Sequence, residues 1–218
     1  MDFLVRALLT SKWTKVAVFF LCLIPFASLV WRSLHSDLGA NPVETLQHAT
    51  GDWTLRFLIF TLCITPFRKL FNLPDLIRFR RMLGLFAFFY VCLHFITYLG
   101  PDQQFYLAGM WKDVAKRPFI TVGFTAFVLL IPLAITSTAG WIRRLGGKRW
   151  QLLHRSIYFA AVLGVIHYYW LVKSDVREPV FYGALVAILL LWRLGSWFSR
   201  RKSQPSVRVT APSVSIDG

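Results

Sequence analysis

The stretch MLGLFAFFYVCLHFITYL, residues 82–99, contains no charged side chain and one histidine, His94. A bilayer core of roughly 30 Å needs about 20 mostly apolar helical residues per crossing. The stretch therefore predicts a transmembrane helix. The histidine inside it indicates a function, because an ionisable side chain at membrane depth is costly.

Other apolar stretches of similar length lie on both sides of this one, and most charged residues fall in the short segments between them. These further apolar stretches are residues 16–34, 53–70, 118–136, 156–172 and 179–198. Only 16% of the 218 residues are charged, against about a quarter in a typical soluble domain. The pattern predicts an all-α membrane protein, a bundle of six transmembrane helices.

The same pattern predicts the domain organisation. Residues 1–15 form a cytoplasmic N-terminus, residues 16–198 form the transmembrane domain, and residues 199–218 form a disordered basic cytoplasmic tail. Two of the apolar stretches contain arginines, Arg56 and Arg193, so five crossings with one interfacial helix are the alternative.

Basic residues predict the orientation. With both termini in the cytoplasm, 18 of the 25 lysines and arginines lie on the inner side, as the positive-inside rule requires. The net charge of +15 is then a signal of topology in a bacterial inner membrane. Nucleic-acid binding is the other common meaning of such a charge, and it is disfavoured because the basic clusters flank apolar stretches and match no nucleic-acid-binding motif.

Two segments lie on the outer side in this topology. Residues 35–52 contain turn formers followed by a short helical piece that ends at Gly51, and residues 100–117 carry aromatic side chains suited to the membrane interface. The sequence contains no glycine-rich phosphate loop and no Ser–His–Asp arrangement. A nucleotide site of the soluble type is therefore not expected.

Two histidines are predicted to lie at the same depth. His94 follows the inner charge Arg81 by 13 residues, and His167 follows Arg155 by 12 residues. At about 1.5 Å per residue, both lie roughly 18–20 Å from the inner edge, on helices that run in the same direction. Two neutral imidazoles at one level are what the iron of a haem b with two histidine ligands requires. Hydrogen bonding of each ring to a neighbouring helix is the alternative that the residues leave open.

The other histidines are weaker candidates. His154, near the inner side, is a candidate for ligating a second haem, contacting a haem propionate or lining a quinone or flavin pocket, and a plain interfacial role is as compatible. The third stretch offers no histidine partner for a second haem, because the matching level holds Arg80 and Arg81. His48, in the outer segment, is a candidate for an additional ligand, and His35 is expected to be solvated.

Eight ordered blocks of sequence carry a family resemblance. They are LGANPVETLQHATG (38–51), ITP (64–66), RRMLGL (80–85), LHFITY (93–98), RPFITVG (117–123), TST (136–138), GKRWQLLH (147–154) and IHYYW (166–170). On these blocks the chain resembles the MsrQ (YedZ) family, haem-binding membrane subunits of the periplasmic methionine-sulfoxide reductase system, within the ferric-reductase-like transmembrane group.

The residues alone are compatible with more than one role, and the resemblance implies a particular one, electron transfer. It implies that His94 and His167 are the main haem ligands and that the quinone pool supplies the electrons. The acceptor would be a periplasmic molybdopterin-containing catalytic subunit, MsrP, which repairs oxidised proteins. The resemblance also implies FMN in the system, for which this chain has no motif. The methionine-sulfoxide chemistry would belong to the partner chain, so no residue here is predicted to be catalytic.

Two rival functions are compatible with parts of the pattern. A ferric or cupric reductase fed by a cytoplasmic flavin reductase would share the fold and the haem. A small transporter or assembly factor would use the histidines for proton relay, but the sequence contains no inverted repeat of broken helices.

Overall fold

The computed structural model describes residues 2–172 and 174–202, and every regular element in this part is helical. The elements are α1 (Asp2–Thr10), α2 (Lys12–Leu34), α3 (Pro42–Leu70), η1 (Pro74–Leu76), α4 (Ile77–Thr97), η2 (Tyr98–Asp102), α5 (Leu107–Lys116), α6 (Pro118–Ile135), α7 (Ala139–Leu145), α8 (Gly147–His154), α9 (Ser156–Leu171) and α10 (Arg177–Lys202). Each predicted apolar stretch corresponds to one long helix, in the order α2, α3, α4, α6, α9 and α10.

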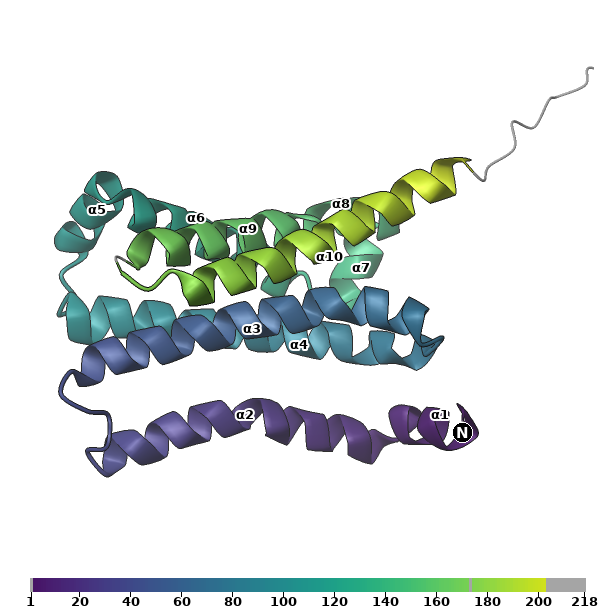
Figure 1. Cartoon of the computed structure of the whole chain (residues 1–218), viewed down its shortest axis with the longest axis horizontal. Helices are drawn as coiled ribbons and strands as arrows, with labels where there is room; N and C mark the ends of the chain where they lie inside the picture. Colours follow the sequence, from purple (N-terminus) through teal and green to yellow (C-terminus); the bar gives the residue numbers. More distant parts are fainter. Residues whose placement is uncertain (1, 173, 203–218) are drawn as a thin grey trace, which may run out of the picture.

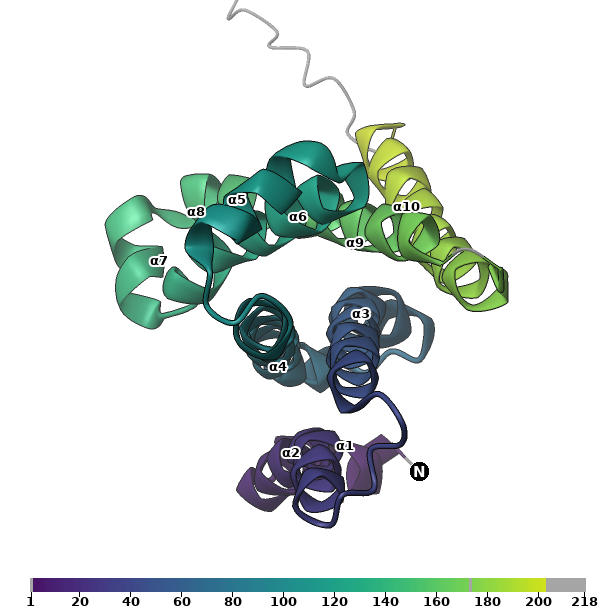
Figure 2. The ribbon, with the colours of Figure 1, turned by 90° about the vertical axis from the view of Figure 1, so that its left-hand side faces the viewer.

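The long helices lie side by side in three layers. α2 forms the first layer, α3 and α4 form the second, and α6, α9 and α10 form the third (Figure 1, Figure 2). The core includes Leu58, Ala87, Ala160 and Ala161, which are almost inaccessible. Small residues such as these alanines allow helix backbones to approach closely in a membrane bundle.

Within the described residues, four segments are long and apolar enough to cross a membrane. They are Lys12–Leu34, Pro74–Asp102, Pro118–Ile135 and Arg177–Ser199. Large apolar side chains on the outside of the bundle are exposed, among them Phe20 of α2 and Leu191 of α10, as contact with lipid requires. The chain is an all-helical, multi-pass membrane protein.

α3 and α9 fall outside this set for different reasons. α3 is 29 residues long, about 43 Å, but it carries charged residues such as Arg56 and Arg68. α9 has only 16 residues. Arg155, just before it, has helical φ and ψ angles of −71° and −20°, so the helical backbone conformation continues from α8 into α9. The sequence indicated weaker spans at residues 53–70 and 179–198, and the second of these, in α10, qualifies in the structure.

The segment 35–52 differs in part from its prediction. α3 begins at Pro42 and continues through Gly51, so the helical piece predicted after the turn formers is present, but its predicted end at Gly51 is wrong. The side chain of Asn41 caps the helix, because its oxygen accepts the Glu44 N–H at 3.3 Å. Proline also suits the first helical position, where its missing N–H is not needed.

Both ends of the chain are more helical than predicted. α1 occupies most of the predicted N-terminal segment 1–15, and Ser11 separates it from α2 by accepting the Trp13 N–H. α10 runs to Lys202, so the first four residues of the predicted tail 199–218 are helical. The rest of that predicted tail lies outside the described residues.

Tyr90 of α4 fastens α2 to the bundle. α2 contains Pro25, which lacks an N–H and interrupts the helical hydrogen-bond ladder. The Tyr90 hydroxyl donates to the Cys22 carbonyl at 2.8 Å and accepts the Phe26 N–H at 3.0 Å. One fully buried hydroxyl is therefore inserted into the main-chain ladder of α2 beside the proline.

Replacing Tyr90 by phenylalanine is expected to destabilise the protein. The Cys22 carbonyl and the Phe26 N–H lose their partner, which costs about 1–3 kcal/mol. Denaturant unfolding in detergent micelles, followed by circular dichroism, measures the loss, and Tyr169→Phe at a half-exposed position is the control. Equal stability of the two variants would contradict the role given to Tyr90.

Candidate functional site

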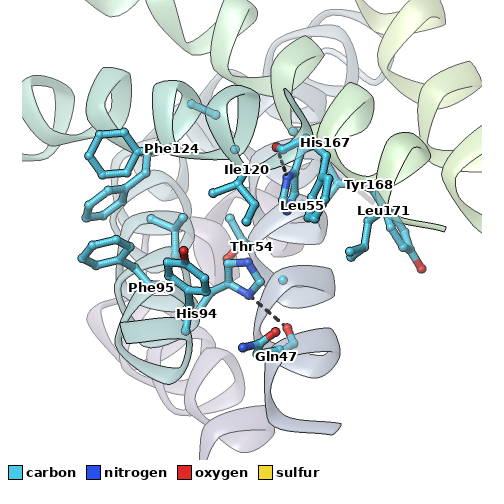
Figure 3. A pocket seen from close by; sticks show the side chains of 18 of the residues that line it. Gln47, Thr54, Leu55, His94, Phe95, Ile120, Phe124, His167, Tyr168 and Leu171 are labelled. Atoms are coloured by element: carbon cyan, nitrogen blue, oxygen red, sulfur yellow. Dashed lines mark hydrogen bonds between the residues drawn. The ribbon is translucent and has the colours of Figure 1, made fainter. Parts of the chain in front are cut away.

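His94 and His167 come from different helix pairs and meet in one cavity. His94 lies near the end of α4 and His167 near the end of α9. Their ring centroids are 6.1 Å apart, and the two ring planes are inclined by 80°. Figure 3 shows both rings projecting into the cavity from facing sides. The structure thus brings together the two histidines that residue counting places at one depth.

A backbone carbonyl holds each ring. The Nδ1 atom of His94 donates to the Gln47 carbonyl at 3.0 Å, and that of His167 donates to the Phe119 carbonyl at 2.7 Å. A carbonyl accepts and never donates, so the hydrogen of each neutral ring is on Nδ1. Neither Nε2 has a hydrogen-bond partner in the described part of the chain. Each Nε2 therefore offers a free lone pair to a metal.

A glycine on the neighbouring helix makes room for each ring. A Cβ on Gly51 of α3 would lie 3.2 Å from His94 Cε1, and a Cβ on Gly123 of α6 would lie 2.6 Å from His167 Nδ1. In both cases the glycine follows the bonded carbonyl residue by four positions, about one helical turn. The same unit of carbonyl, glycine and histidine thus occurs twice, in α3–α4 and in α6–α9.

The spacing of the two rings suits a single metal between them. A metal–imidazole bond is about 2 Å long and the ring centroid lies about 1.1 Å behind the nitrogen, so two opposed rings have centroids about 6 Å apart. The observed separation is 6.1 Å. No group of three or more His, Cys, Asp or Glu side chains that could hold a metal occurs among residues 2–172 and 174–202. Two imidazole nitrogens would suit an iron whose other ligands come from a macrocycle.

The cavity around the rings has a volume of about 370 Å³, within the range of cofactor pockets. Its walls are mostly apolar and include Leu55, Val91, Ile120 and Phe127. Gln47 also lines the cavity, and its Nε2 atom is buried with no hydrogen-bond partner within the described ranges. An apolar cavity with one open donor and two free imidazole nitrogens fits haem b, a flat macrocycle with carboxylate side chains.

Polar side chains line the end of the cavity nearest α5. They are Glu44, His48, Asp102 and Arg117. His48 lies in the second turn of α3, not in the predicted loop, and its Nε2 is 3.8 Å from Glu44 Oε1. The structure places this candidate ligand at the mouth of the cavity, apart from the facing rings.

His154 lies at the other end of the bundle, in α8. Its Nε2 is 3.0 Å from the Thr136 hydroxyl oxygen, and that hydroxyl donates to the Pro132 carbonyl at 2.6 Å. The Thr136 oxygen therefore accepts from His154, which carries its hydrogen on Nε2. Burial, and then the positive charge of Arg80, lower the pKa of His154 below its ordinary value and keep the ring neutral. The Nε2 atom of His154 therefore has a hydrogen-bond partner, whereas the Nε2 atoms of His94 and His167 have none among the described residues.

Four contributors to the site were not predicted from the sequence. They are the carbonyls of Gln47 and Phe119 and the glycines Gly51 and Gly123. A backbone carbonyl leaves no signal in a sequence. A glycine does, because glycine inside a helix costs about 1 kcal/mol relative to alanine and so indicates a packing requirement.

Comparison with known proteins adds independent findings. A family model described as a ferric reductase like transmembrane component matches residues 50–165. The protein-methionine-sulfoxide reductase heme-binding subunit MsrQ of Herminiimonas arsenicoxydans is 56% identical over 87% of this chain and 88% of its own length. The subunits with the same name from Caulobacter vibrioides and Rhodospirillum rubrum are 49% and 50% identical, over 87% of this chain and 89% and 91% of their own. No solved structure matches the chain.

Gly123→Ala is expected to destabilise the protein, whereas Gly164→Ala is not. The new methyl group at position 123 overlaps the His167 ring, and overpacking of this kind costs about 1–3 kcal/mol. At Gly164 the new Cβ would lie 3.7 Å from Leu55, an ordinary contact, and the helix gains up to about 1 kcal/mol from alanine. Thermal unfolding of both variants in detergent makes the comparison. Changes of the same sign and size would show that the ring contact is not a constraint.

Proposed function

Since the chain belongs to the MsrQ family of ferric-reductase-like transmembrane proteins, we propose that it is a haem b electron-transfer subunit. It passes electrons from the quinone pool to a periplasmic molybdopterin-containing catalytic subunit of the MsrP type, which repairs methionine sulfoxide in oxidised proteins. The observation that carries the proposal is the pair of free Nε2 atoms on His94 and His167, on rings whose centroids are 6.1 Å apart.

In this proposal each residue of the cavity has a defined task. His94 and His167 would hold the haem iron through their Nε2 atoms. Haem, when bound, supplies one-electron transfer. The Gln47 and Phe119 carbonyls fix the tautomer and the orientation of the rings. The apolar walls exclude water, and the Gln47 amide and the Arg117 guanidinium are donors for the haem carboxylates.

The proposal includes six spans in a bacterial inner membrane. α3 packs along α4, and α9 packs along α6 and α10, so both accompany helices that qualify by length and apolarity (Figure 1). Both termini are cytoplasmic, because the basic residues of α7, α8 and the end of α10 gather at one end of the bundle. The ring pair then lies in the outer half, near the periplasm.

The periplasmic end offers a surface on which the catalytic subunit can dock. α5 lies at this end of the bundle (Figure 1). Phe105, Tyr106, Leu107 and Trp111, in and just before α5, are all more than half exposed. The polar mouth of the cavity opens beside them, so electrons have a short path from the ring pair to a docked partner.

Quinol is the proposed electron donor, and FMN is carried over from the family resemblance; neither is assigned to a residue. His48 is proposed to remain at the mouth of the cavity, outside iron coordination. His154 is kept apart from the haem of the ring pair, because its Nε2 is engaged with Thr136 and lies near Arg80. A second haem at His154 would therefore need a different arrangement from that of the first.

The reduced-minus-oxidised visible spectrum of the purified protein tests the haem assignment. We expect the spectrum of low-spin haem b, and its loss in His94→Ala and in His167→Ala, because each variant removes one axial nitrogen. His35→Ala is the control, since His35 stacks on Trp31 at 4.0 Å, away from the cavity. A protein without haem absorbance, or unchanged spectra in both alanine variants, is incompatible with the proposal.

The electron donor is tested by anaerobic reduction of the purified subunit. A short-chain quinol is expected to reduce the haem without any soluble flavoprotein, and addition of the MsrP-type subunit with methionine sulfoxide should reoxidise it. Reduction by NADPH and a cytoplasmic flavin reductase, with quinol inactive, would instead favour the ferric or cupric reductase.

A further inference from the structure

A group of aromatic rings forms one wall of the cavity, beside His94. Phe95 follows His94 directly in α4, and Phe124 and Phe127 of α6 line the same cavity. The centroid of the Phe95 ring is 4.8 Å from that of Phe127 and 6.1 Å from that of Phe124, and rings at such separations are in contact. Figure 3 shows Phe95 and Phe124 on the same side of the cavity. Packed aromatic side chains therefore begin next to one of the two histidine rings.

Trp111 of α5 continues this group to the surface of the protein. Its ring centroid is 5.6 Å from that of Phe124, and the two planes are inclined by 79°, an edge-to-face contact. Trp111 is nevertheless 56% exposed, so one edge of its ring packs on the cavity wall while much of the side chain faces outward. The ring contacts thus lead from the cavity to the outer surface in two steps, Phe124 and then Trp111.

The surrounding contacts hold α5 in place. Asp113 of α5 accepts a hydrogen bond from Gln103 Nε2 at 3.2 Å, and its Oδ1 lies 3.4 Å from Arg117 Nε. Gln103 precedes the helix and Arg117 follows it, so both ends are connected to Asp113. Met110, beside Trp111, is almost completely buried. The position of the Trp111 ring is therefore fixed by the fold.

Two observations favour a protein partner for this surface over lipid headgroups, which exposed tryptophans also contact. α5 lies at the outer end of the bundle and packs on α6, as the two views of the ribbon agree (Figure 1, Figure 2). Lys112 and Lys116 are exposed beside Trp111 and form no ion pair in the described part of the chain. An aromatic centre with a charged rim has the composition of a protein interface, and a basic rim complements an acidic one.

We propose that Trp111 is the docking contact through which electrons leave the cavity, by way of Phe124, to a redox protein with an apolar centre and an acidic rim. The inference rests on the proposed function, because it needs a haem between His94 and His167. Electron tunnelling weakens steeply with distance and with empty space, so closely packed side chains carry it better than an open gap. Each event moves one electron from the haem to the redox centre of the partner. No bond forms or breaks in this chain, and the two rings serve as the medium without being oxidised.

Two measurements on the haem-loaded protein test the proposal. Equilibrium binding of the oxidised subunit to the MsrP-type subunit gives a dissociation constant, and stopped-flow mixing of the reduced subunit with saturating partner gives the rate of haem reoxidation. Trp111→Ala should weaken binding at least about tenfold, because exposed tryptophans at the centre of an interface contribute most of its affinity. Trp111→Phe keeps an aromatic ring and should weaken binding less.

Phe124→Leu separates the path from the docking contact. The smaller aliphatic side chain leaves a gap behind Trp111 but keeps the outer surface, so the dissociation constant should stay unchanged while the saturated rate falls several-fold. Trp31→Ala is the control, since Trp31 is an exposed tryptophan at the outer end of α2, in the layer farthest from α5. It should change neither quantity.

The haem spectrum of each variant is recorded first, and rates are compared per bound haem. A native protein without haem would contradict the proposed function. With haem present, equal binding by Trp111→Ala and Trp31→Ala would overturn this inference alone and would leave lipid headgroups as the neighbours of Trp111. A native saturated rate in Phe124→Leu would overturn it as well, because electrons would then leave by another path.

Discussion

A neutral imidazole inside an apolar helix bundle must give its N–H to an acceptor, and this requirement organises the structure. The acceptors are the main-chain carbonyls of Gln47 and Phe119. A helical carbonyl has a second lone pair, but a ring reaches it only where two helices lie close together. Gly51 and Gly123 permit that approach. The pairing of α3 with α4 and of α6 with α9, and hence the layers in Figure 2, agree with this constraint.

Neither helix pair forms the site alone. Each pair contributes one free Nε2, and the two nitrogens meet only where the second layer packs on the third. Arg56 of α3 strengthens this junction, because its Nε donates to the Tyr182 hydroxyl of α10 at 2.8 Å and its Nη2 lies 3.9 Å from Asp52. Arg56 is the charged residue that counted against residues 53–70 as a span, and its partners lie within the bundle.

The apolar stretches were predictable because length and absence of charge are local properties of a sequence. The common depth of His94 and His167 was predictable for the same reason, since helical rise converts residue counts into distances. The start of α3 was not, because Asn41 and the proline after it are read equally well as a turn or as a helix cap. The roles of Gly51 and Gly123 depend on which helices become neighbours, and spacing along the chain does not determine that.

The angle of 80° between the two rings is a property of the chain. Each ring is fixed at Nδ1 by a carbonyl and bordered by the backbone of a glycine helix, so neither can turn freely. In the proposed function, a haem iron held by the two Nε2 atoms would meet rings whose planes are nearly perpendicular, because packing against the glycine helices orients each ring.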